Sequence, residues 1–175
     1  MAKASKRTAT VKKAAVKKTA SKKAVTQTAK PVEKKKKPTI NLKYSDKSAG
    51  QSELLEIFNA IKKMAEPYDG KGAMVLHTNT GGQFNLVSHK PVEIAGRKRN
   101  ELWFISALVQ KGYVGFYFMP VYMNEPMQKV FSPEFIKCLK GKACFHIKKN
   151  DPVIMKDIQK AFKLGYQAYK DRGWL

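Results

Sequence analysis

The sequence lacks several features that would place it in a well-defined class. It has only two cysteines, Cys138 and Cys144, in 175 residues. These are too few for a disulfide framework and favour a reducing compartment. No apolar run approaches the ~20 residues that span a bilayer, and the N-terminus has no hydrophobic segment of the secretory type. We therefore expect a cytoplasmic protein that does not associate with membranes.

Recognised catalytic signatures are missing as well. The chain contains no G-x-S-x-G, no H-E-x-x-H and no dinucleotide-binding fingerprint. Cys144 and His146 would share a strand face, so they could hold a metal together with His77 or His89 across the sheet. A lone histidine or cysteine on a strand is, however, usually structural. The sequence therefore predicts a non-enzymatic protein with no metal and no cofactor.

Acidic residues are scarce and unevenly distributed. The chain has 13 of them against 35 lysines and arginines, for a formal net charge of +22. Residues 1–43 contain 15 basic residues and a single acid, Glu33, whereas residues 44–175 contain 20 basic and 12 acidic residues. The excess charge is thus mainly a property of the first quarter. We divide the chain into a basic tail (residues 1–43) and a mildly basic domain (residues 44–175).

The basic tail has no aromatic residue and no leucine or isoleucine before Ile40. Such a segment buries too little apolar surface to offset the entropy of ordering, and its like charges repel. We therefore predict that the tail is disordered. Its lysine- and alanine-rich composition resembles the basic tails of linker histones and of bacterial histone-like proteins.

Lysine pairs recur every five residues in this tail, a period that does not match a helix and favours a flexible arm. Closely spaced lysines displace counterions from a polyanion and bind it with little sequence preference. The sequence therefore predicts DNA or RNA as the partner, and nucleoid association follows if the partner is DNA. A solvated extension and an organelle transit peptide remain alternatives. The predicted phosphate contacts are Lys12, Lys13, Lys17, Lys18, Lys22, Lys23, Lys34, Lys35, Lys36 and Lys37.

The domain is organised around residues 101–120, where two apolar runs are joined by Gln110-Lys111-Gly112. This pattern predicts an antiparallel hairpin whose first strand lies inside the sheet and is covered on both sides. The class is α+β, an antiparallel sheet of about five strands packed with N- and C-terminal helices. The other predicted elements are a helix capped by Ser48 or Ser52 and running to about Ala65, strands at 73–78 and 83–89, a loop at 119–126, a short helix from Ser132-Pro133, a strand at 143–148, a helix from Asp151-Pro152, and a chain end at Trp174-Leu175 that folds back on the domain.

Two places in the domain are candidate contact sites. Alternation in the second strand of the hairpin puts Tyr113 and Tyr117 on one face with Gly115 between them, which could form a ligand platform or a base-stacking surface. Packing beneath a helix or the chain end is the simpler interpretation. Residues 95–100 form a break in the sheet, and the expected basic loop there is either a solvated turn or a second phosphate contact. Its charged residues are Arg97, Lys98 and Arg99.

The C-terminal part of the chain resembles the YdhG-like family of bacterial domains (domain of unknown function 1801) over roughly residues 52–175. Matching features are Gly112-Tyr113-Val114, Met119-Pro120, Gly141-Lys142, Cys144-Phe145 and the terminal helix. The resemblance implies a small α+β domain. One branch of the family is regarded as frataxin-like and linked to iron delivery, which implies acidic ligands.

The acids of this chain depart from that branch. In the first predicted helix only Glu53 and Glu56 lie within one turn of each other. Our primary hypothesis is a non-enzymatic protein whose tail binds DNA or RNA through phosphate contacts. The alternative is a small-ligand or metal-binding domain, of the iron-delivery kind, whose tail is a solubilising extension.

Overall fold

The computed structural model describes residues 44–175. The predicted disorder of the basic tail and its ten predicted lysine contacts lie outside the described residues. The elements are α1 (Ser52–Ala65), the 3-10 helix η1 (Glu66–Tyr68), β1 (Met74–Thr80), β2 (Gln83–Ser88), β3 (Val92–Ile94), β4 (Arg97–Arg99), β5 (Leu102–Gln110), β6 (Tyr113–Phe118), α2 (Met119–Met123), the 3-10 helix η2 (Glu125–Val130), α3 (Pro133–Lys137), β7 (Cys144–Ile147) and α4 (Pro152–Asp171).

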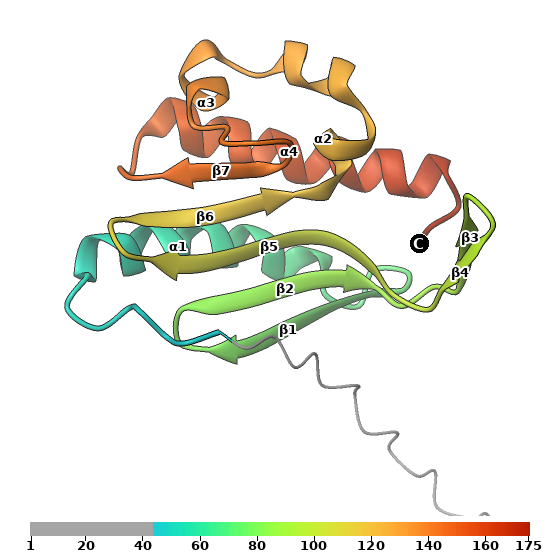
Figure 1. Cartoon of the computed structure of the whole chain (residues 1–175), viewed down its shortest axis with the longest axis horizontal. Helices are drawn as coiled ribbons and strands as arrows, with labels where there is room; N and C mark the ends of the chain where they lie inside the picture. The colour runs from blue at the N-terminus through green and yellow to red at the C-terminus, as the bar shows by residue number, and fades with distance from the viewer. Residues whose placement is uncertain (1–43) are drawn as a thin grey trace, which may run out of the picture. The chain divides into compact units, whose positions relative to one another are not determined.

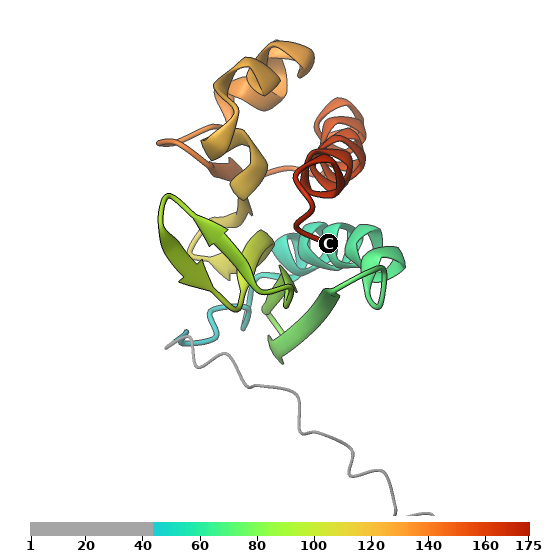
Figure 2. The same ribbon diagram turned by 90° about the vertical axis from the view of Figure 1, so that its right-hand side faces the viewer.

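Five antiparallel strands form one sheet in the order β1-β2-β5-β6-β7. Helices α1 and α4 lie side by side on one face of this sheet (Figures 1 and 2). Figure 2 shows the small β3–β4 hairpin projecting on the opposite side, which we call the helix-free face. The predicted α+β class is confirmed. No helix within residues 44–175 is long and apolar enough to cross a membrane.

The predicted hairpin at the centre of the sheet is formed by β5 and β6. Its register pairs Ile105 with Phe118 and Val109 with Val114, and Gly112 turns the chain with φ of +82°. A φ in this range is accessible to glycine without steric cost. Strand β5 is the third of five, as predicted, but helices cover it on one side only. Its other face therefore remains available for a site.

A β-bulge in β5 decides which side chains reach the helix-free face. Leu86 pairs with Ile105 and Val87 with Trp103, so Phe104 has no partner on β2. Phe104 consequently joins Ile105 on the helix side, where its ring packs 5.0 Å from that of Tyr169. Strict alternation along β5 would instead put Phe104 on the face of Ser106 and Trp103 on the face of Ile105, and the register excludes it. A bulge changes the direction of the side chains on either side of it.

Helix α4 covers the centre of the sheet. It begins as predicted, since the Asp151 carboxylate accepts hydrogen bonds from the backbone amides of Val153 and Ile154 at 2.8 and 3.2 Å, which stabilises a helix N-terminus. Gly165 lets the helix approach the sheet closely. A Cβ at this position would lie 2.6 Å from a ring carbon of Phe118 and 2.8 Å from one of Phe104.

Several local predictions require correction. Neither Ser48 nor Ser52 caps α1, because Gln51 is the N-cap residue and provides no side-chain cap. The loop expected after the central hairpin contains two short helices, α2 and η2. The loop expected at 95–100 contains strand β4, paired with β3. Ala95 and Gly96, with φ of 51° and 72°, form the turn, and alanine is an unusual residue for a position that Asn, Asp or Gly normally occupies.

The chain end folds back on the domain as predicted. The Ser88 hydroxyl donates a hydrogen bond to the Trp174 carbonyl, and Lys90 Nζ donates one to the Leu175 carbonyl at 2.8 Å. The Trp174 ring packs edge-on against Tyr169 at 5.2 Å. Trp174 therefore lies against the C-terminal end of α4.

Replacing Gly165 by alanine tests the close approach of α4. We expect Gly165→Ala to lower the free energy of unfolding by about 1–3 kcal/mol, the usual cost of overpacking a core, although alanine has the higher helix propensity. Denaturant unfolding measures the change, and Lys170→Ala, an exposed position of the same helix, is the matched control. A Gly165→Ala variant as stable as the control would contradict the described packing.

Candidate binding site

A hollow of about 420 Å³ lies on the helix-free face, and we call it the sheet groove. Three aromatic side chains line it, Tyr44 from the segment before α1, Trp103 from β5 and Tyr117 from β6. The remaining lining residues are Gln83, Ser106, Leu108, Gln110 and Met119. The groove thus combines apolar rings with uncharged polar groups, which is the usual composition of a small-molecule site.

Strand register explains how the sequence builds this groove. Neighbouring strands are about 4.8 Å apart, so directly paired residues form rows across the sheet. Ser106 is small and lies between two larger residues of its row, which leaves the hollow. The two rows on the helix-free face are Asn85–Ser106–Tyr117–Cys144 and Gln83–Leu108–Gly115–His146.

Two amide side chains beside the groove have unsatisfied hydrogen-bonding capacity. Gln83 is 2 % exposed and Asn85 is 0 % exposed, yet Gln83 Oε1 and Asn85 Nδ2 have no hydrogen-bond partner. The Ser106 hydroxyl donates to Asn85 Oδ1. Exchanging the amide oxygen and nitrogen of Asn85 would still leave one atom unpaired, because the hydroxyl can satisfy only one of them. Buried unpaired polar groups are rare and costly, so a partner for these atoms is expected.

The aromatic rings of the groove are held by hydrogen bonds of their own. Trp103 Nε1 donates to Glu101 Oε1 at 3.0 Å, and the Tyr44 hydroxyl donates to the Val109 carbonyl. The Tyr117 hydroxyl is hydrogen-bonded to the thiol of Cys144. Burial, followed by this hydrogen bond, raises the pKa of Tyr117 to about 12, and burial also raises the pKa of Tyr44. Both phenols are therefore neutral at physiological pH.

A histidine pair, His77 on β1 and His89 just after β2, adjoins the groove. His77 Nε2 and His89 Nε2 are 3.1 Å apart, and His89 Nδ1 lies 3.9 Å from Glu101 Oε2. Glu101 thus contacts both the indole of Trp103 and the ring of His89. This arrangement fixes the orientation of the Trp103 ring beside the groove.

The two predicted platform tyrosines have different environments. Tyr117 lines the sheet groove, whereas Tyr113 stacks on His146 with ring centroids 3.9 Å apart. The space over Gly115 is filled, since a Cβ there would lie 3.2 Å from a Tyr117 ring carbon. Sequence reasoning did not identify Trp103, Gln83 or the other polar residues of the groove. The available signal was the presence of Gln83, Asn85 and Ser106 in otherwise apolar strands.

Basic residues lie at both ends of the helix-free face. Strand β4 presents its three predicted basic residues to solvent, with Lys98 paired opposite Glu93. Beyond Tyr113, a shallow hollow of about 380 Å³ is lined by four lysines together with His146 and Asp151. The Asp151 carboxylate caps α4, and the lysines contribute to a lowered pKa of His146, after the larger effect of burial. The four residues are Lys137, Lys140, Lys148 and Lys149.

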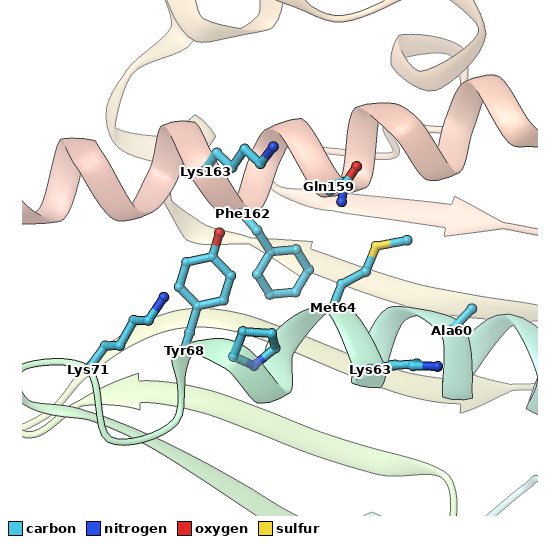
Figure 3. A pocket seen from close by; sticks show the side chains of 9 residues that line it. Ala60, Lys63, Met64, Tyr68, Lys71, Gln159, Phe162 and Lys163 are labelled. Atoms are coloured by element: carbon cyan, nitrogen blue, oxygen red, sulfur yellow. The ribbon is translucent and has the colours of Figure 1, made fainter.

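A separate cleft of about 520 Å³ lies between the end of α1 and α4. Figure 3 shows Tyr68 and Phe162 side by side, with Lys71 next to Tyr68 and Lys163 above the two rings. The two rings stack with centroids 5.5 Å apart, and Lys71 Nζ lies 5.2 Å from the centre of Tyr68. Three lysines, including Lys63, and no acidic residue line this cleft. It can attract an anion but contains no unpaired buried group.

The arrangement considered for a metal does not form. Cys144 and His146 are on β7, at the opposite edge of the sheet from His77 on β1. With about 4.8 Å between strands, His89, which follows β2, is also more than 10 Å from them. Among residues 44–175, no three His, Cys, Asp or Glu side chains lie close enough together to hold a metal ion.

The raised pKa of Tyr117 predicts a change in alkaline stability. Between pH 10, where an exposed tyrosine titrates, and about 12, the folded state retains a proton that the unfolded state has lost. The free energy of unfolding therefore falls as pH rises through this range. We expect Tyr117→Phe to lose less stability than the wild-type protein when denaturant unfolding is compared at about pH 9 and pH 11. Equal losses would show that Tyr117 ionises normally.

Comparison of the chain with models of known families, with curated proteins and with solved structures found no match.

Proposed function

We propose that this chain is a non-enzymatic binding protein that holds DNA or RNA through sequence-independent phosphate contacts. The observation that carries the proposal is the charge of residues 1–43, with 15 basic residues against one acid. A segment of this kind gains affinity for a polyanion by releasing condensed counterions. If the partner is DNA, the protein is nucleoid-associated.

Charge on the domain supports the same function. Among residues 44–175, the side-chain pair within ion-pair distance joins His89 to Glu101, and no lysine or arginine of these residues forms a salt bridge with an Asp or Glu side chain. The hollow at the β7 edge and the exposed strand β4 provide two further basic surfaces. Uncompensated lysines raise the local concentration of a polyanion and steer its approach.

Small-ligand binding is a second candidate, favoured by the unpaired amides beside the sheet groove. In this alternative the tail is a solubilising extension, and ligand affinity does not depend on it. The iron-delivery form lacks support within residues 44–175, where no cluster of possible ligands occurs. We retain the YdhG-like assignment as a proposal, supported by the order of helices and strands in the domain.

The salt dependence of binding tests the primary proposal. If six to ten phosphates are neutralised, the affinity of the full chain for a labelled DNA decamer should fall on the order of a thousandfold between 50 and 200 mM salt. Changing the six paired lysines to glutamine should weaken binding and flatten this dependence. The six positions are Lys12, Lys13, Lys17, Lys18, Lys22 and Lys23.

The matched control changes the same six lysines to arginine, which keeps the charge and should keep both affinity and salt dependence. Residues 44–175 alone should lose most of the affinity. Equal binding by the full chain and by residues 44–175 would contradict the assignment of phosphate binding to the tail.

A further inference from the structure

The sheet groove is not explained by phosphate binding. None of its eight lining residues is an acid, a lysine, an arginine or a histidine. Its two phenols are neutral at physiological pH, because a tyrosine titrates only near pH 10, and burial raises the pKa of Tyr44 and of Tyr117 further. Placing an ionised group in such a site without a counter-charge is unfavourable. The chemistry of the groove therefore suits an uncharged ligand.

Three rings define the shape of that ligand. Trp103, Tyr44 and Tyr117 each satisfy their polar atom within the protein, through Glu101, the Val109 carbonyl and Cys144 respectively. Their remaining contribution to a ligand is apolar ring surface. Because these hydrogen bonds fix the rings before binding, less conformational entropy is lost on association. Aromatic surfaces held in this way favour a planar ring as the ligand.

The unpaired amides define the edge of the ligand. Gln83 Oε1 can accept a hydrogen bond and Asn85 Nδ2 can donate one. The two residues alternate along β2 on the helix-free face, and Gln83 lines the groove itself. A ring edge that carries both a donor and an acceptor would satisfy them, and such an edge is characteristic of a nucleobase.

We infer that the sheet groove binds a neutral planar ring with an amide-like hydrogen-bonding edge, the chemistry of a nucleobase. The ring can come from an unpaired base of a bound strand or from a free nucleoside. Binding of an unpaired base from a strand rests on the proposed function. It agrees with the lining of the groove, because Trp103 follows the basic strand β4 in the chain and Tyr117 pairs with Cys144 on β7, beside the lysine-lined hollow. Aromatic surfaces between positive charges are typical of single-strand binding.

Tryptophan fluorescence gives a direct test, because the chain has only two tryptophans. Trp103 lines the groove, whereas Trp174 packs against Tyr169 at the end of α4. In the full chain carrying Trp174→Phe, emission therefore reports on the groove alone. We expect saturable quenching by a single-stranded DNA decamer and none by an abasic decamer of the same length, which has the phosphates without the bases.

Affinity measurements complete this test. Trp103→Ala should weaken binding of the decamer about 5- to 150-fold, the usual effect of removing a stacking ring, and should leave binding of the abasic decamer unchanged. Trp174→Phe should alter neither. Quenching of Trp103 by free adenosine or uridine without any binding of the decamer would support the groove with a free nucleoside as its ligand, and would contradict the proposed function.

If the decamer binds by anisotropy but Trp103 emission does not change, or changes equally with the abasic decamer, the inference is overturned while the proposed function stands. If neither the decamer nor a nucleoside binds to the protein, both the inference and the proposed function are overturned.

Gln83→Met provides a second test that keeps the volume of the side chain. Methionine removes the unpaired buried oxygen of Gln83, so we expect Gln83→Met to unfold at a higher denaturant concentration than the wild-type protein. It should also weaken decamer binding about 2- to 12-fold, the loss of one neutral hydrogen bond. Unchanged decamer affinity in Gln83→Met would show that the amide serves no ligand and would overturn the role given to it.

Discussion

One-sided covering of the central sheet is the constraint on which this structure depends. Helices α1 and α4 pack on the same face, and α4 approaches closely enough that Gly165 has no room for a side chain. Strand β5 nevertheless has apolar residues at consecutive positions, and strict alternation would put half of them on the face without helices. The bulge at Phe104 resolves this by placing Phe104 and Ile105 together on the helix side. Trp103 is then left on the helix-free face, where it lines the sheet groove.

Charge plays a minor part in the stability of the domain. Residues 44–175 contain one ion pair, between partly exposed groups, and such pairs contribute little. The core consists largely of phenylalanine rings, among them Phe135 and Phe145, which stack with centroids 4.2 Å apart. Unneutralised lysines destabilise a compact state by self-repulsion. The polyanion binding that we propose would give these lysines a function.

Local sequence patterns predicted the fold well, but they did not predict features that depend on the pairing of residues far apart in the chain. Asp151-Pro152 begins a helix because the Asp151 carboxylate caps backbone amides of the first turn and proline suits the first helical position. The Tyr113–Phe118 strand alternates as its sequence indicates. The bulge at Phe104 depends on how β2 pairs with β5, which no single strand reveals. The β3–β4 hairpin was missed because Ala95 adopts a positive φ. The groove joins residues from three strands, the start of α2 and the segment before α1, so they come together only in the folded chain.

We propose that nucleic acid is bound by the basic tail together with the helix-free face. Nuclear magnetic resonance of the full, isotopically labelled chain, recorded while a single-stranded decamer is added, tests both parts at once. We expect shifts in residues 1–43, in the Trp103 indole and in the Gln83 side-chain amide, with α1 largely unaffected. Shifts confined to the tail would contradict a role for the groove. A spectrum without shifts in residues 1–43 would contradict the function proposed for the chain.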